Sequence, residues 1–188
     1  RRSSDLMADL RYIRGAMERA GAFTAVPGRG GVAMGATAVI AAVIASRQTA
    51  PERWLAVWLL EAAVAAAIGG VTMARKARRE ESQIWAGPGR KFASAFLPAL
   101  MTGALLTAGL WRTGEPALLP AVWLLLYGTA VVAGGAFSVR IVPALGACLW
   151  VFGVAALIAP QWGDAWLAAG FGGTHLVFGY FIARRHGG

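Results

Sequence analysis

The sequence has very few residues that could form covalent cross-links or a charged surface. Cys148 is the only cysteine among the 188 residues, which excludes an intrachain disulfide and a zinc site built on cysteines. Charged residues make up only 14% of the chain, whereas about 25% is typical of soluble domains. With 57% hydrophobic residues, a soluble fold of this length would leave too much apolar surface in water. The composition therefore predicts a polytopic membrane protein and nearly excludes a soluble enzyme.

Six apolar stretches approach or reach the length of about 20 residues that a membrane-spanning helix needs. They cover residues 30–46, 53–73, 92–111, 117–137, 141–159 and 165–183. Pro51 and Pro116 precede two of these stretches, and proline is well tolerated at helix starts. We therefore predict an all-α bundle of six transmembrane helices over residues 30–188, preceded by a cytoplasmic or interfacial segment over residues 1–29.

The N-terminal segment carries a helical apolar stripe. Leu6, Leu10, Ile13 and Met17 recur at spacings of three and four residues, and arginines flank them. This pattern predicts a basic amphipathic helix that lies on the membrane surface. A helix that docks a soluble partner is the alternative interpretation.

The positive charge of the chain is concentrated on one side of the predicted bundle. The net charge is +9, and only Arg47, Arg53 and Arg112 fall in the connections of the opposite side. The positive-inside rule then predicts that both termini are cytoplasmic. Topology and attraction to anionic lipid explain the charge better than nucleic-acid binding, which we do not expect.

Three arginines stand where helices enter or leave the predicted membrane. Arg29 and Arg90 each complete a Pro-Gly-Arg phrase before an apolar stretch, and Arg140 lies in the short link between the fourth and fifth stretches. An arginine at this level can reach a lipid phosphate. We predict that these three side chains contact lipid headgroups or other anions.

Two phrases recur along the chain and suggest repeated two-helix hairpins. The sequence Ala-Val-Trp-Leu-Leu occurs at residues 56–60 and again at residues 121–125, at nearly the same offset as the two Pro-Gly-Arg phrases. Copies that contain two spans each would be parallel. Chance recurrence is the alternative, because these residues are common in membrane helices.

Glu61 is the only acidic residue well inside an apolar stretch. A charge placed in lipid costs at least about 2.5–3.5 kcal/mol on insertion scales, so this side chain is expected to face the interior of the bundle. Two roles remain open. Glu61 forms a proton, cation or cationic-ligand site, or it fixes the packing of helices through a hydrogen bond.

His175 and Tyr127 are two further polar groups at depth. Gly172 and Gly179 share a helix face with His175, which favours a close helix contact there. His175 either bonds across that interface or forms a ligand or proton site that faces Glu61 or Tyr127. Tyr127 lies in the middle of the fourth stretch, where its hydroxyl needs a partner.

The sequence lacks the motifs of several chemistries. It has no phosphate-binding loop, no metal-ligand spacing, no lysine inside an apolar stretch and no recognisable nucleophile with its base. We therefore predict no enzyme activity, no metal and no cofactor. The leading hypothesis is a membrane bundle that binds or passes a small ligand, proton or ion at Glu61, His175 and Tyr127. The alternative is a structural, sensory or accessory subunit, self-associated or in a membrane complex, which docks a partner through its basic face.

Several phrases of the chain resemble those of a known group of proteins. They include Phe23-Thr24-Ala25-Val26-Pro27-Gly28, Gly87-Pro88-Gly89-Arg90-Lys91-Phe92, and the runs Gly134 to Arg140 and Gly170 to His175. The chain is similar, over most of its length, to a family of small six-span bacterial integral membrane proteins that is uncharacterised. The resemblance implies a bacterial inner-membrane location, and it implies no activity and no functional residues.

Overall fold

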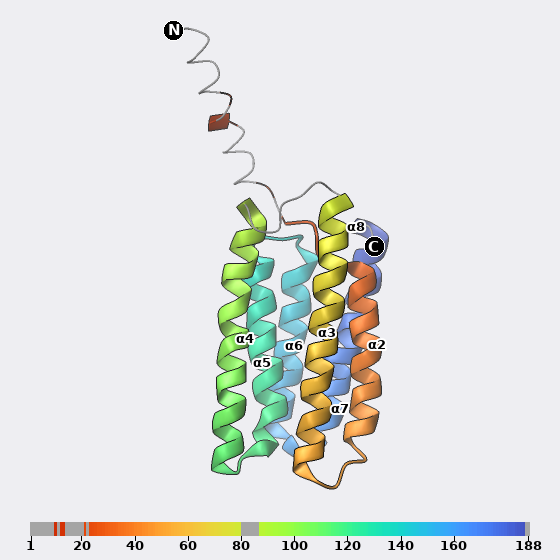
Figure 1. The fold of residues 1–188 in the computed structure, drawn as a ribbon, viewed down its shortest axis with the longest axis vertical. Coiled ribbons are helices and arrows are strands. Elements are labelled where there is room, and N and C mark those ends of the chain that lie inside the picture. Colours follow the sequence, from red (N-terminus) through yellow and green to blue (C-terminus); the bar gives the residue numbers. More distant parts are fainter. Residues whose placement is uncertain (1–9, 11, 14–20, 22, 80–86, 187–188) are drawn as a thin grey trace.

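The structure is a bundle of helices that run side by side, and it is all-α (Figure 1). The computed structural model describes residues 10, 12, 13, 21, 23–79 and 87–186. Most of the predicted N-terminal amphipathic helix lies outside the described residues. Six helical spans in the described part are long and apolar enough to cross a membrane, which confirms the predicted polytopic fold.

The observed spans match the six predicted apolar stretches. They comprise α2 (Gly28–Ala45), α3 (Pro51–Arg79), α4 (Gly87–Thr113), η1 with α5 (Pro116–Leu118 and Leu119–Gly135), α6 (Ile141–Ile158), and a composite sixth span. The sixth span consists of η2 (Pro160–Trp162), α7 (Gly163–Leu167), η3 (Ala168–Gly173) and α8 (Thr174–His186). Of these, η3 is a π-helix. The main difference from prediction is that α3 and α4 are longer than their apolar stretches.

Two helix pairs approach each other closely because glycine lies between them. A Cβ atom built on Gly35 of α2 would lie 2.7 Å from the backbone nitrogen of Leu176 in α8. A Cβ atom on Gly128 of α5 would lie 2.9 Å from the carbonyl oxygen of Gly146 in α6. Any larger residue would force these backbones apart, so glycine sets the spacing of the central helices.

Two helices are peripheral and have few buried residues. α3 packs chiefly on α2, and α4 packs chiefly on α5. Their outward side chains are large and apolar, with Leu60 of α3 67% exposed and Leu105 of α4 74% exposed. In a membrane, these faces contact hydrocarbon rather than water, so their exposure is not a defect of the fold.

The two hairpins that carry the recurring phrases place them in different environments. In the α2–α3 hairpin the first helix is central, whereas in the α4–α5 hairpin the second helix is central. Trp58 and Trp123 occupy equivalent positions in the phrases, and Trp58 is buried whereas Trp123 is half-buried. The repetition of a hairpin unit stays a prediction.

The segment before α2 is fixed to the same end of the bundle as the link between α5 and α6. The amide of Phe23 donates a hydrogen bond to the carbonyl oxygen of Phe137 at 2.7 Å, and the Ser138 hydroxyl donates to the carbonyl oxygen of Phe23 at 2.6 Å. The ammonium group of Lys76 at the end of α3 donates to the carbonyl oxygen of Val26 at 3.1 Å. These contacts join three connections at one end of the bundle.

Candidate functional site

A hydrogen-bonded pair of polar side chains joins α5 to α8 in the interior of the bundle. The hydroxyl oxygen of Tyr127 lies 3.2 Å from Nε2 of His175. His175 is buried, with only 7% of its surface exposed, and Tyr127 is partly buried. The structure thus brings together two of the three side chains that the sequence singled out for a polar site.

The second ring nitrogen of His175 determines the direction of this hydrogen bond. Nδ1 lies 2.8 Å from the carbonyl oxygen of Phe171. A carbonyl oxygen only accepts hydrogen bonds, so Nδ1 carries the hydrogen. In a neutral imidazole Nε2 is then an acceptor, and the Tyr127 hydroxyl donates to it. The hydroxyl oxygen of Tyr127 keeps lone pairs that can accept a hydrogen bond from another group.

Aromatic rings surround the Tyr127 side of this pair. The rings of Phe96 and Phe171 meet the Tyr127 ring edge-on, with centroids at 5.8 Å and 5.4 Å. Such edge-to-face contacts are favourable beyond the apolar area that they bury. They hold the phenol ring in place from α4 on one side and from the sixth span on the other.

The π-helix η3 immediately precedes His175. It covers Ala168–Gly173, and α8 begins at Thr174. π-helical turns are rare and frequently occur at functional sites. Here the following side chains are Thr174 and His175, both buried.

Glu61 lies in a different helix interface. Its Oε1 atom lies 2.8 Å from the Thr37 hydroxyl oxygen, across the contact between α3 and α2. Glu61 belongs to the stripe of α3 that includes buried Trp58 and partly buried Ala65, and the side chain is itself partly buried. The predicted site residues therefore occupy two polar pairs, Glu61 with Thr37 and Tyr127 with His175.

A third polar cluster, at the opposite end from Lys76, was not anticipated from the sequence. Asp164 at the start of α7 accepts hydrogen bonds at Oδ1 from the indole nitrogens of Trp54 (2.8 Å) and Trp58 (3.2 Å). The ring of Trp54 also stacks on Trp123 of α5, with centroids at 5.6 Å and an angle of 5°. In the sequence, the feature that could have indicated this cluster is the recurring phrase, in which Trp58 and Trp123 occupy equivalent positions.

The three arginines predicted to contact anions are all exposed and lie at the same end of the bundle. Arg29 is at the start of α2, Arg90 is near the start of α4, and Arg140 immediately precedes α6. Their exposure agrees with the prediction of headgroup contact, which stays a prediction. Within the part of the chain that the structure describes, no group of three His, Cys, Asp or Glu side chains is close enough to hold a metal ion.

The fold and its apolar spans define an all-α integral membrane protein with lipid-facing helices. No protein-family model matches the chain, and neither a curated protein nor a solved structure matches it. The similarity to small six-span bacterial membrane proteins therefore stays a prediction from the quoted phrases.

Proposed function

We propose that this protein binds a small, mostly apolar ligand within the membrane and that Tyr127 and His175 hold its polar end. The observation that carries the proposal is the hydrogen bond between Tyr127 and His175 at a depth where polar groups are costly. The ligand donates a hydrogen bond to the hydroxyl oxygen of Tyr127, whose own hydrogen is directed to His175. The protein is non-catalytic in this proposal.

The surroundings of the pair support an apolar ligand rather than a hydrated ion. Phe96 and Phe171 flank the Tyr127 ring, and aromatic walls with a few placed polar groups are typical of small-molecule sites. Phe96 lies on α4, which packs chiefly on one neighbour and can shift more easily than a central helix. The ligand therefore enters from the lipid side, next to α4.

The location and orientation of the protein are part of the same proposal. The described ends of α3 and α8 carry Arg75, Arg78, Arg79, Arg184 and Arg185 at the end of the bundle where α2 and α4 begin. By the positive-inside rule that end is cytoplasmic, and the bacterial inner membrane is the location that the resemblance of the quoted phrases implies.

A photoreactive phenol tests the proposed site. 4-Hydroxybenzophenone supplies an apolar body, a hydroxyl donor and a group that cross-links on irradiation. We expect it to label residues in α5 and in the sixth span of the protein in nanodiscs. The labelling yield of the Tyr127→Phe variant should be at least about tenfold lower than that of the wild type. One good hydrogen bond in a dry site is worth about 1.4 kcal/mol or more.

Tyr12 provides a matched control for that experiment. It is a tyrosine that precedes α2 in the chain and is 73% exposed, so Tyr12→Phe should label like the wild type. Equal labelling of the Tyr127→Phe variant and the wild type contradicts the proposed function. Labelling of a His175→Gln variant then shows whether the histidine positions the phenol, with a reduced yield expected.

A further inference from the structure

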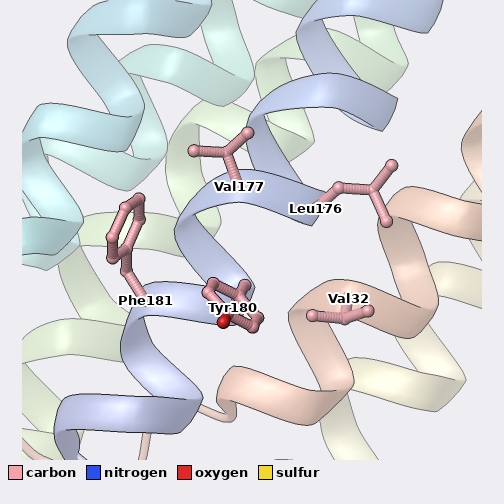
Figure 2. A pocket seen from close by; sticks show the side chains of 5 residues that line it. All are labelled: Val32, Leu176, Val177, Tyr180 and Phe181. Carbon is pink, nitrogen blue, oxygen red and sulfur yellow. The ribbon is translucent and has the colours of Figure 1, made fainter.

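An open apolar groove of about 420 Å³ runs along the outer surface between α2 and α8 (Figure 2). Its volume falls in the range of about 300–1,000 Å³ that is usual for ligand sites. Val32 lines it from α2, and α8 contributes Leu176, Val177, Tyr180 and Phe181. The exposed side chains on its α8 wall show that the groove opens outward rather than into the bundle.

The groove follows from the close contact of the two helices beneath it. A Cβ atom on Gly31 of α2 would lie 3.1 Å from the Cα atom of Gly179 in α8. Because the backbones touch at these glycines, the larger side chains on either side stand apart at the surface. Val32 and Tyr180 each follow one of the two glycines and form opposite walls.

Positive charge flanks one end of the groove. Gly28 of α2 contacts Ala183 of α8, so the next residues in the chain, Arg29 and Arg184, lie at the same end of the helix pair, and both are exposed. Arg184 also places its guanidinium carbon 4.8 Å from the centroid of the Tyr180 ring. The charged end and the apolar groove are therefore in direct contact.

The described residues place no acidic side chain at this end of the bundle. Within residues 23–79 and 87–186, the acidic residues are Glu52, Glu61, Glu115 and Asp164. Three of them lie at or near the opposite helix ends, and Glu61 lies within α3. Within the described residues, the arginines next to the groove therefore belong to the positively charged end of the bundle, which attracts an anion.

We propose that the groove binds one anionic phospholipid from the bilayer. Its acyl chain lies against Val32, Val177 and Phe181, and its phosphate is bound by Arg29 and Arg184. Arginine matches phosphate well, because its planar guanidinium can donate two parallel hydrogen bonds. The groove is apolar along its length and has two arginines at one end, which matches a phospholipid with its apolar acyl chain and its phosphate at one end. The site is separate from the Tyr127–His175 pair, so the proposal does not depend on the proposed function.

Native mass spectrometry of the purified protein tests this site. The protein is loaded in parallel with phosphatidylglycerol and with phosphatidylcholine of the same acyl chains, and the retained lipid is counted after detergent release. The wild type should retain one phosphatidylglycerol in preference to phosphatidylcholine. The double variant Arg29→Gln/Arg184→Gln should retain at least about fivefold less, because each basic residue near an anionic lipid contributes about that factor.

The double variant Arg78→Gln/Arg79→Gln is the matched control. It removes the same charge from exposed positions at the same end of the bundle, on α3, which contributes no residue to the groove, and it should keep the lipid. An equal loss in this control overturns the proposal, because retention would then reflect the general charge of that face. Equal retention of the two lipids by the wild type overturns it too.

Val177→Trp tests the apolar half of the site. Val177 is 52% exposed, so an indole at this position fills the groove without entering the packed interior. We expect this variant to lose phosphatidylglycerol as the arginine variant does. Unchanged retention in a variant with wild-type thermal stability overturns the groove assignment. A lipid-free dimer of the wild type would instead identify a second copy as the occupant.

Discussion

Thr37 and Glu61 are hydrogen-bonded across the α2–α3 interface, with 2.8 Å between Oγ1 and Oε1. The Thr37 hydroxyl oxygen also lies 3.0 Å from the carbonyl oxygen of Met34. The hydroxyl has one hydrogen, so it donates either to an ionised Glu61 or to Met34. In the second case a protonated Glu61 donates to Thr37. This geometry accommodates the carboxyl group in both protonation states.

Replacing Glu61 by Gln should therefore have little effect on stability. A glutamine amide can donate to Thr37 or accept from it, as the two states of the carboxyl group do. Thr37→Val removes the partner and should lower the free energy of unfolding by about 1 kcal/mol, as for other hydrogen bonds between membrane helices. Denaturation of the protein in mixed micelles measures both changes. A larger loss for Glu61→Gln than for Thr37→Val would contradict the structural interpretation of this pair.

Gly35→Ala should destabilise the bundle. The new Cβ atom would meet the backbone nitrogen of Leu176 at 2.7 Å, and backbone cannot move aside as a flexible side chain can. Overpacking of this kind typically costs about 1–3 kcal/mol. Gly70→Ala is the control, because its Cβ atom has no neighbour within 4 Å. We expect thermal unfolding to show a lower midpoint for Gly35→Ala and an unchanged or higher midpoint for Gly70→Ala.

Asp164→Ala should loosen the attachment of α3 to α7. The substitution removes the carboxylate oxygen that accepts hydrogen bonds from the indole nitrogens of Trp54 and Trp58. We expect a loss of about 1.5–3 kcal/mol in the free energy of unfolding, which is usual for hydrogen bonds to a charged group. Asp164→Asn keeps an acceptor and should lose less. Glu115→Ala, at an exposed position, should be neutral, and a similar loss there would point to net charge as the cause.

Cysteine labelling of intact cells tests the orientation. In a Cys148→Ser background, a cysteine is placed at Arg112 or at Arg184, at opposite ends of the bundle. A membrane-impermeant maleimide should react with the Arg112→Cys variant, since the positive-inside rule puts that end outside the cytoplasm. The Arg184→Cys variant should react only after the cells are opened. The reverse pattern would show that the proposed orientation is wrong.

The spans were predictable because membrane insertion depends on the length and hydrophobicity of one segment at a time. Residues 141–159 were predicted as a span, and α6 covers Ile141–Ile158. The extension of α3 to Arg79 was missed. Its last turns carry basic residues, which reduce hydropathy without opposing helix formation.

The positions of the site residues were predictable only in part. Tyr127 was predicted as one of two residues that His175 could face, and the structure joins these two side chains. The partner of Glu61 stayed open, because nothing in a single sequence tells which face of α2 meets α3. The contact of Asp164 with Trp54 and Trp58 joins residues more than 100 positions apart. Such contacts depend on how the helices are arranged, which local periodicity does not determine.

The central helices α2 and α6 have 18 residues each, or about 27 Å of length. This is slightly less than the hydrocarbon thickness of about 30 Å in a typical bilayer. α3, with 29 residues, would extend about 44 Å and pass beyond that layer. The protein therefore combines central helices slightly shorter than the hydrocarbon layer with a peripheral helix whose basic last turns extend beyond it. Thinner bilayers should suit the short helices, and the long one must tilt or project into the headgroups.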